Sequence, residues 1–250
     1  MKSIYLLFIS LSLSAFSLHM DYIGELSIFG KVAEASIVYS NNGKKYHIRV
    51  VGYGTGIVGY LTQHKKYIYQ SIGVVKKNQL LPLKYIAQET AQDYNKTKVY
   101  TFDYEHNKTI VTKYKEEKRE EPIYNVFSSA RKTRSKFINE KSTKILDKVY
   151  DNDMVSVLFN KKNNLLKMKI GESKLIRATG SKDTQKGIIV KLVSINGGKY
   201  KYSVMLKKDY LKGGSAKVTF ILDSNNILYK AKVNGILFFG NATVKRYQIQ

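Results

Sequence analysis

The chain contains no cysteine and no tryptophan among its 250 residues. Without cysteine there is no disulfide, no thiolate metal site and no cysteine nucleophile. No cysteine is available to carry a lipid either, so we predict that the protein is not a bacterial lipoprotein. An exported protein without cysteine suits a bacterial periplasm, whereas a small secreted eukaryotic domain would more often be stapled by disulfides.

Acidic residues are also scarce. The 19 Asp and Glu residues stand against 43 Lys and Arg, which gives a net charge of +24. Such a charge attracts anionic surfaces. For an exported protein the candidate partners are an anionic membrane surface, acidic glycans and an envelope protein. The lysines are spread along the chain rather than gathered in a motif, so we expect no nucleic-acid partner. The alternative is a solvated basic surface without a dedicated partner.

Residues suited to catalysis or metal binding are few. No two of the four histidines have the spacing of paired metal ligands. No Gly-x-Ser-x-Gly elbow occurs, although a Ser-His-Asp triad forms in space and stays open as an alternative. The paired glutamates at 116–117 and 120–121 lie within a charge run and are interpreted as solvated. We predict a protein that is not an enzyme, with no metal and no cofactor.

Long apolar runs are missing after the amino terminus. Residues 1–17 combine a lysine near the start, an apolar run from Ile4 to Leu13 and small residues around Ala15-Phe16-Ser17, which is the pattern of a secretory signal. We predict cleavage after Ser17, a periplasmic location and a single β domain over residues 18–250. The run is too short for an ordinary membrane span. An uncleaved anchor and a buried first strand are the alternatives.

Proline occurs only 2 times, whereas tyrosine occurs 20 times. Tyrosine favours half-buried pleated surfaces, and alternating apolar residues recur between turn signals such as Asn42-Gly43 and Asn196-Gly197. The pattern predicts a mainly β fold, a curved antiparallel sheet or open β-barrel with two short inserted helices. Asp21–Ala35 is interpreted as one long first strand that bends at Gly30. Gly52–Gly59 is interpreted as a bent crossing in which no helix starts.

Three segments later in the chain depart from simple alternation. Residues 115–148 are interpreted as a basic, partly helical insertion, with a helix over Ile123–Ile138. Asp151-Asn152-Asp153 predicts the start of a second short helix that ends near Asn160. Leu165–Ile170 is interpreted as a strand.

Seven aromatic residues lie on the apolar side of alternating strands: Tyr100, Phe102, Tyr104, Tyr200, Tyr202, Phe220 and Tyr229. On a curved sheet they would form a concave apolar surface. Side chains and the inserted helices would fill this surface as an ordinary core, or it would stay open as a groove for an acyl chain. Lysines at the groove mouth would attract an anionic head group. We take these seven residues as candidate ligand-binding residues.

Two segments, 93–97 and 105–109, fit the pattern acid-x-Asn-x-Thr. This pattern resembles the extended acceptor site of some bacterial oligosaccharyltransferases. Asn95 and Asn107 are predicted to lie at turns, where an acceptor is exposed. They are candidate glycosylation sites, although chance matches are common in a chain rich in Asn and Lys.

Several short motifs follow one another in a specific order. They are Tyr22-x-Gly24-x-Leu26, Gly30-x-x-x-Glu34-Ala35, Gly43-x-x-Tyr46, Tyr69-x-Ser71-x-Gly73, Leu81-Pro82-x-x-Tyr85, Asp153-x-x-Ser156-x-x-Phe159 and Ile236-x-x-x-Gly240-x-Ala242. In this order they resemble the exported bacterial domain-of-unknown-function 3108 family. The basic insertion and a missing proline near Leu228 depart from its pattern. The resemblance implies a fold similar to periplasmic lipoprotein-carrier half-barrels, with an apolar groove and no established activity.

Two functions follow from these expectations. The first is binding or carriage of a hydrophobic or lipid-like component of the cell envelope. The alternative is an interaction or structural module of the envelope that binds a protein partner through its basic face. A pocket that is large and dry enough for an acyl chain favours the first function. A filled concavity with an exposed apolar patch outside favours the second.

Overall fold

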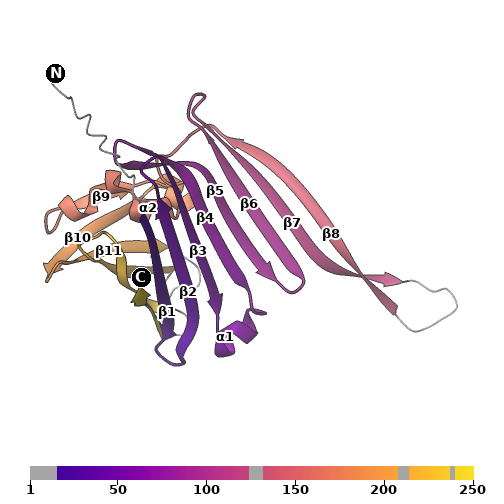
Figure 1. Ribbon diagram of the computed structural model, residues 1–250. Helices are drawn as coiled ribbons and strands as arrows, with labels where there is room; N and C mark the ends of the chain where they lie inside the picture. Colours follow the sequence, from indigo (N-terminus) through magenta and orange to yellow (C-terminus); the bar gives the residue numbers. More distant parts are fainter. Residues whose placement is uncertain (1–15, 124–131, 208–213, 237–239) are drawn as a thin grey trace, which may run out of the picture.

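One continuous antiparallel sheet of fourteen strands makes up most of the protein. The computed structural model describes residues 16–123, 132–207, 214–236 and 240–250 (Figure 1). The strands are β1 Phe16–Leu26, β2 Gly30–Asn41, β3 Lys45–Gly54, β4 Lys66–Lys76, β5 Gln79–Ala91, β6 Tyr94–Asp103, β7 Lys108–Ile123, β8 Lys132–Leu146, β9 Ser173–Ile176, β10 Ile188–Asn196, β11 Lys199–Lys207, β12 Ser215–Leu222, β13 Leu228–Ile236 and β14 Gly240–Ile249.

The sheet consists of two meanders that meet in its middle. Strands β1 to β8 pair in chain order, as do β9 to β14, and β1 pairs with β14. The two free edges are therefore β8 and β9, which are neighbours in the chain but lie at opposite ends of the sheet. The curved, open antiparallel sheet confirms the predicted fold class. Strand β1 begins at Phe16, and the predicted signal segment lies mostly outside the described residues.

The segment between the two edges, residues 147–172, lies on the concave face and is called the plug here. It contains α2 (Ser156–Phe159) and the two 3-10 helices η1 (Lys161–Asn163) and η2 (Leu165–Lys167). Figure 1 shows α2 inside the curve of the sheet. The other helices are α1 (Gly56–Leu61) and α3 (Lys182–Lys186). Within the described chain, no helix has the length and apolar character needed to cross a membrane.

Inward-facing side chains form two apolar clusters around the plug. The first cluster comes mainly from β1 to β7, with Ile48 fully buried, and also includes Val155 of the plug. The second comes from β9 to β12, with Leu192 and Tyr202 fully buried, together with Leu165 of the plug. Burial of apolar area on both sides of the plug is therefore the main force that holds it against the sheet.

The predicted single first strand was wrong. Strand β1 ends at Leu26, a three-residue turn follows, and β2 starts at Gly30, whose φ of +67° favours glycine. The two strands then pair along their whole length, from Leu26↔Gly30 to Phe16↔Asn41. Apolar alternation runs through the turn, so the sequence pattern of a hairpin resembled that of one bent strand.

The predicted helix over Ile123–Ile138 was wrong as well. Ile123 ends β7 and residues 132–138 belong to β8, while residues 124–131 lie outside the described chain. The basic segment is a long hairpin that extends away from the rest of the sheet (Figure 1). Opposite charges such as Lys115 and Glu140 face each other across its strands, which favours pairing as strands.

Two shorter predictions also failed, and one was confirmed. Leu165–Ile170 is not a strand, because Asn164 takes a left-handed conformation and starts η2. A helix does start in the glycine-rich stretch, at Gly56. The second predicted helix is present as α2 and ends at Phe159, next to the predicted Asn160.

Candidate functional site

A buried carboxylate fastens the plug to the sheet. Asp153 is fully buried. Its Oδ2 accepts a hydrogen bond of 2.5 Å from Ser71 Oγ on β4, and its Oδ1 accepts bonds of 2.8 Å from the backbone N–H groups of Val155 and Ser156. Ser156 Oγ accepts in return from the backbone N–H of Asp153 at 2.9 Å. One carboxylate therefore caps the start of α2 and joins it to the sheet.

The hydrogen-bond chain continues to Tyr46, whose Oη lies 3.0 Å from Ser71 Oγ. Burial raises the pKa of Asp153 above its ordinary value, while the hydrogen bonds from Ser71, Ser156 and Val155 act in the opposite direction. Burial, and then the charge of Asp153, raise the pKa of Tyr46. These side chains line none of the cavities described below, so their bonds act on the fold rather than on a bound molecule.

Three of the sequence motifs meet at this anchor. They supply Tyr46, Ser71 and Asp153, which are far apart in the chain. Gly73, two residues after Ser71, leaves room for the same contact, because a Cβ atom there would come within 2.1 Å of the Leu81 carbonyl oxygen and 2.7 Å of the Tyr46 ring. Residues from three of the sequence motifs therefore hold the plug against the sheet.

Asparagine side chains attach the rest of the plug. Asn160 Nδ2 donates to the Leu80 carbonyl at 2.8 Å, and Asn160 Oδ1 accepts from the Leu80 N–H at 3.2 Å. Asn226, in the turn after β12, donates from Nδ2 to the Leu158 carbonyl at 2.7 Å. The plug is thus bonded to both meanders of the sheet.

An apolar cavity of about 200 Å³ lies between the plug and strands β9 to β12. Only one of its lining residues, Thr184, has a polar side chain that forms hydrogen bonds, and that hydroxyl donates to the Ser181 carbonyl at 3.0 Å. The lining is Met154, Val157, Leu158, Leu165, Ile176, Ala178, Thr184, Ile188, Val190, Val204, Val218 and Phe220. Met154 is 40% exposed, so the cavity reaches the surface. We call it the plug cavity.

Six of the seven predicted aromatic residues lie in the two apolar clusters. Tyr100, Phe102 and Tyr104 pack in or against the first cluster, and Tyr200, Tyr202 and Phe220 in or against the second. Among the seven, only Phe220 lines the plug cavity.

Tyr229 lies outside both clusters. Its side chain is 36% exposed, and Lys199 Nζ lies 3.9 Å from the centre of its ring. The other cavity-lining residues were missed because most are single aliphatic residues without a motif. The alternation of apolar residues along β10 and β12 was the signal in the sequence that could have identified them.

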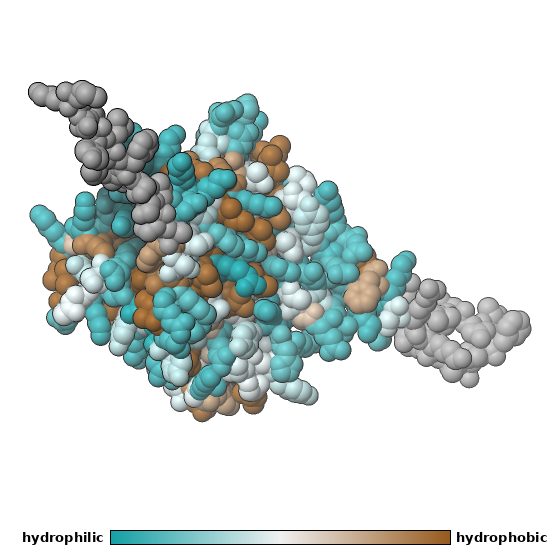
Figure 2. All heavy atoms as spheres, in the orientation of Figure 1, coloured by the Kyte–Doolittle hydropathy of each residue, from teal (hydrophilic) through white to brown (hydrophobic). Residues whose placement is uncertain are grey.

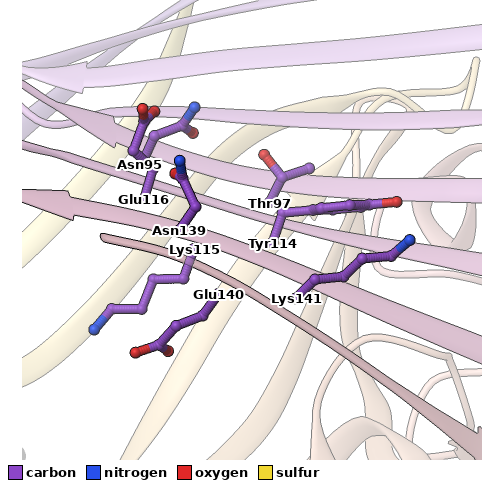
Figure 3. A pocket seen from close by; sticks show the side chains of 8 residues that line it. All are labelled: Asn95, Thr97, Tyr114, Lys115, Glu116, Asn139, Glu140 and Lys141. Atoms are coloured by element: carbon purple, nitrogen blue, oxygen red, sulfur yellow. The ribbon is translucent and has the colours of Figure 1, made fainter. Parts of the chain in front are cut away.

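The other cavities have mixed or polar linings. The largest, about 510 Å³, lies at one end of the sheet between Phe16, Tyr39 and Asn225. Figure 3 shows a hollow of about 300 Å³ on β6 to β8, where Asn95 and Glu116 point to one face of the sheet and Lys115 to the other. This hollow lies on the convex face, opposite the apolar clusters.

The two candidate glycosylation sites lie in different environments. Asn107 lies in the exposed turn between β6 and β7, as predicted, with φ of 53°, and its Oδ1 accepts from the Val149 N–H at 3.1 Å. Asn95 was placed wrongly: it is a half-buried residue of β6, paired with Thr90 and Glu116, because the turn ends at Asp93. Modification of either residue stays a prediction.

Across the described ranges, no three His, Cys, Asp or Glu side chains are placed together to hold a metal ion. The fold and the cavity define a class of protein: an open, barrel-like β-sheet with a plug on its concave face. Residues 16–245 match the family described as "Protein of unknown function (DUF3108)". The chain belongs to this family, as its motifs implied.

No curated protein matches the chain. Among solved structures, the chain is similar to a β-barrel-like protein of domain of unknown function DUF1849 from Brucella abortus. The two share 10% sequence identity, and the match covers 94% of this chain and 97% of the other, with a TM-score of 0.34.

Proposed function

We propose that the protein binds a hydrophobic or lipid-like ligand and carries no catalytic activity. The plug cavity supports this proposal, because its lining is almost entirely apolar and one lining residue, Met154, is exposed at the surface. An apolar cavity of about 150 Å³ can stay dry and take up a benzene-sized molecule. A cavity of about 200 Å³ therefore suits a short apolar group, such as the end of an acyl chain, rather than a whole lipid.

The proposed place of action is the periplasm, after removal of residues 1–17. The signal-like composition of that segment supports an exported location. The net charge, +24 for the full chain and +23 without Lys2, favours a position near anionic membrane surfaces. Native mass spectrometry of protein purified from the periplasm of its host, followed by organic extraction, tests both parts. We expect a chain that starts at Leu18 and a lipid or acyl species released by solvent. A chain that retains residue 1 contradicts the export proposal.

A cavity-filling variant tests the site. Val218→Phe places a larger side chain in the plug cavity, and we expect it to weaken the binding of 1-octanol at least about tenfold in isothermal titration, or about 1.4 kcal/mol. Ile189→Phe is the matched control, since Ile189 is 62% exposed on the outer face of β10, whose inward residues Ile188 and Val190 line the cavity. Equal binding by both variants would contradict the proposal, as would no binding by the unchanged protein.

The second candidate function is a module that binds an envelope protein. The observation that favours it is an apolar patch outside the concavity, where Leu175 and Ile189 face each other across β9 and β10 and Met205 is 60% exposed. Figure 2 shows hydrophobic residues on the surface over these strands. Exposed apolar patches of this kind mark interaction sites. Ile189→Lys should abolish such an interaction and leave octanol binding unchanged.

A further inference from the structure

Lysine side chains gather on the concave face of β6 to β8. Successive residues of a strand point to opposite faces, so Lys98 faces the same way as the buried Tyr100, and Lys113 the same way as the buried Val111. Lys144 shares the face of Leu146, which packs against the first cluster. Lys96 precedes Lys98 by two residues and lies on the same face. The concave surface is therefore apolar next to the plug and basic beyond it.

The register of the strands brings these charges together. Lys98 lies directly opposite Lys113, and Lys144 lies opposite Val111, one position along the same face. Like charges directly opposite each other destabilise a sheet. Two acids near these lysines have other partners. Glu89 lies opposite Lys96 but binds Lys65 at 3.0 Å, and Glu117 binds Lys115.

Four lysines of this face form no salt bridge in the part of the chain that the structure describes, although Glu89 on β5 lies opposite Lys96. Over the described ranges, no ion pair is formed by Lys96, Lys98, Lys113 or Lys144. Partial burial lowers the pKa of Lys98, and the charges of Lys96, Lys113 and Lys144 lower it further. The carboxylate of Glu89 acts in the opposite direction on the pKa of Lys98, but more weakly than these lysines. The four ammonium groups therefore share a positive potential that Glu89 offsets only in part.

The basic group adjoins the entrance of the plug cavity. Tyr100, next to Lys98 on the same face of β6, donates a hydrogen bond of 3.1 Å to the carbonyl of Gly180. Gly180 lies against Met154, since a Cβ atom on Gly180 would approach Met154 Cγ to 2.3 Å. Met154 lines the cavity and is exposed. A continuous path of adjoining residues thus links the cavity entrance to the lysines.

We propose that Lys96, Lys98, Lys113 and Lys144 bind the anionic head group, a phosphate or a carboxylate, of an amphiphile whose tail enters the plug cavity. This inference rests on the proposed function and narrows its ligand to anionic amphiphiles. An ammonium group binds phosphate and carboxylate oxygens as a point charge, so four of them suit either head group.

The test compares three ligands with the same eight-carbon tail: octanoate, octyl phosphate and 1-octanol. We expect the full-length protein to bind both anions at least about tenfold more tightly than the alcohol at low salt, with a preference that falls as salt is added. The variant Lys98→Gln with Lys113→Gln should lose this preference and still bind octanol. The control is Lys66→Gln with Lys84→Gln, two exposed lysines, which should keep the preference.

The outcomes separate this inference from the function on which it rests. If octanol binds as tightly as the anions, or if the Lys98 and Lys113 variant keeps the preference, the head-group site is wrong while the hydrophobic site stands. A separate titration with inorganic phosphate tests whether the lysines bind a free anion rather than the head group of an amphiphile. If phosphate binds through these lysines and none of the three amphiphiles binds, both the amphiphile and the proposed function are overturned.

Discussion

Tyr202 carries a buried hydroxyl for which the described structure offers no hydrogen-bond partner. The side chain is fully buried and stacks on Phe220, with 5.0 Å between the ring centres. Burial raises the pKa of this hydroxyl to about 12. A buried polar group without a partner costs roughly 1–3 kcal/mol. We therefore expect Tyr202→Phe to raise the free energy of unfolding by about 1 kcal/mol in urea denaturation.

Tyr46 provides the comparison, because its hydroxyl bonds to Ser71 at 3.0 Å. Tyr46→Phe removes one partner of a buried hydrogen bond and should lower the free energy of unfolding by about 1 kcal/mol. The opposite signs of the two changes are the informative result. Equal losses in both variants would show that the Tyr202 hydroxyl has a partner such as buried water.

Asp153 should make stability depend on pH in an unusual direction for an aspartate. Its pKa is raised in the fold, so the neutral form is favoured there. The stability that this preference contributes is complete below the unfolded pKa of about 3.9 and is lost as pH rises through the folded pKa.

The variant Asp153→Asn lacks this titration. We expect the free energy of unfolding of the unchanged protein, minus that of the variant, to fall as pH rises above about 4, by about 1.4 kcal/mol per unit of pKa difference. Urea denaturation of both proteins at a series of pH values measures this difference in the free energy of unfolding. Asp151→Asn, at an exposed carboxyl of the same segment, controls for the change in net charge. A difference that rises with pH would mean that the hydrogen bonds outweigh burial.

At the scale of elements, the projecting β7–β8 hairpin contrasts with the plug. Strand β6 pairs with β7 as far as Tyr94↔Glu117, and the Lys118 N–H still donates to the Asp93 carbonyl at 3.0 Å. Beyond Lys118, β7 pairs with β8 alone. Its stability depends on its own cross-strand pairs, while the plug is bonded to both meanders. Lysines along the free edge strand β8 also oppose pairing with another chain.

Removal of the outer hairpin should therefore leave the body of the protein intact. We expect replacement of residues 119–136 by Asn-Gly, which joins the paired residues Lys118 and Phe137 through a tight turn, to change the free energy of unfolding by less than about 0.5 kcal/mol. Urea denaturation and octanol titration measure the two properties. A larger loss would show that the arm supports the sheet.

At the scale of the whole molecule, local alternation was enough to predict the fold class and most of the strands. It also placed six of the aromatic residues in the clusters on the concave side. It could not place the plug, because the bond between Ser71 and Asp153 joins residues 82 positions apart. The pairing of β1 with β14 has no local signal at all. The cavity escaped prediction for the same reason, since its walls come from the plug and from four strands.

The pairing of β1 with β14 has a consequence for how the chain reaches this structure. The first and last strands of the chain meet in the middle of the sheet, where Met20 lies opposite Ile249. Until β14 emerges, the meander from β1 to β8 keeps an unpaired edge at β1, and contacts of such long sequence separation form slowly. Exposed edges of this kind invite aggregation. Assembly therefore has to wait for synthesis of nearly the whole chain, and a holding chaperone would be most useful before β14 pairs with β1.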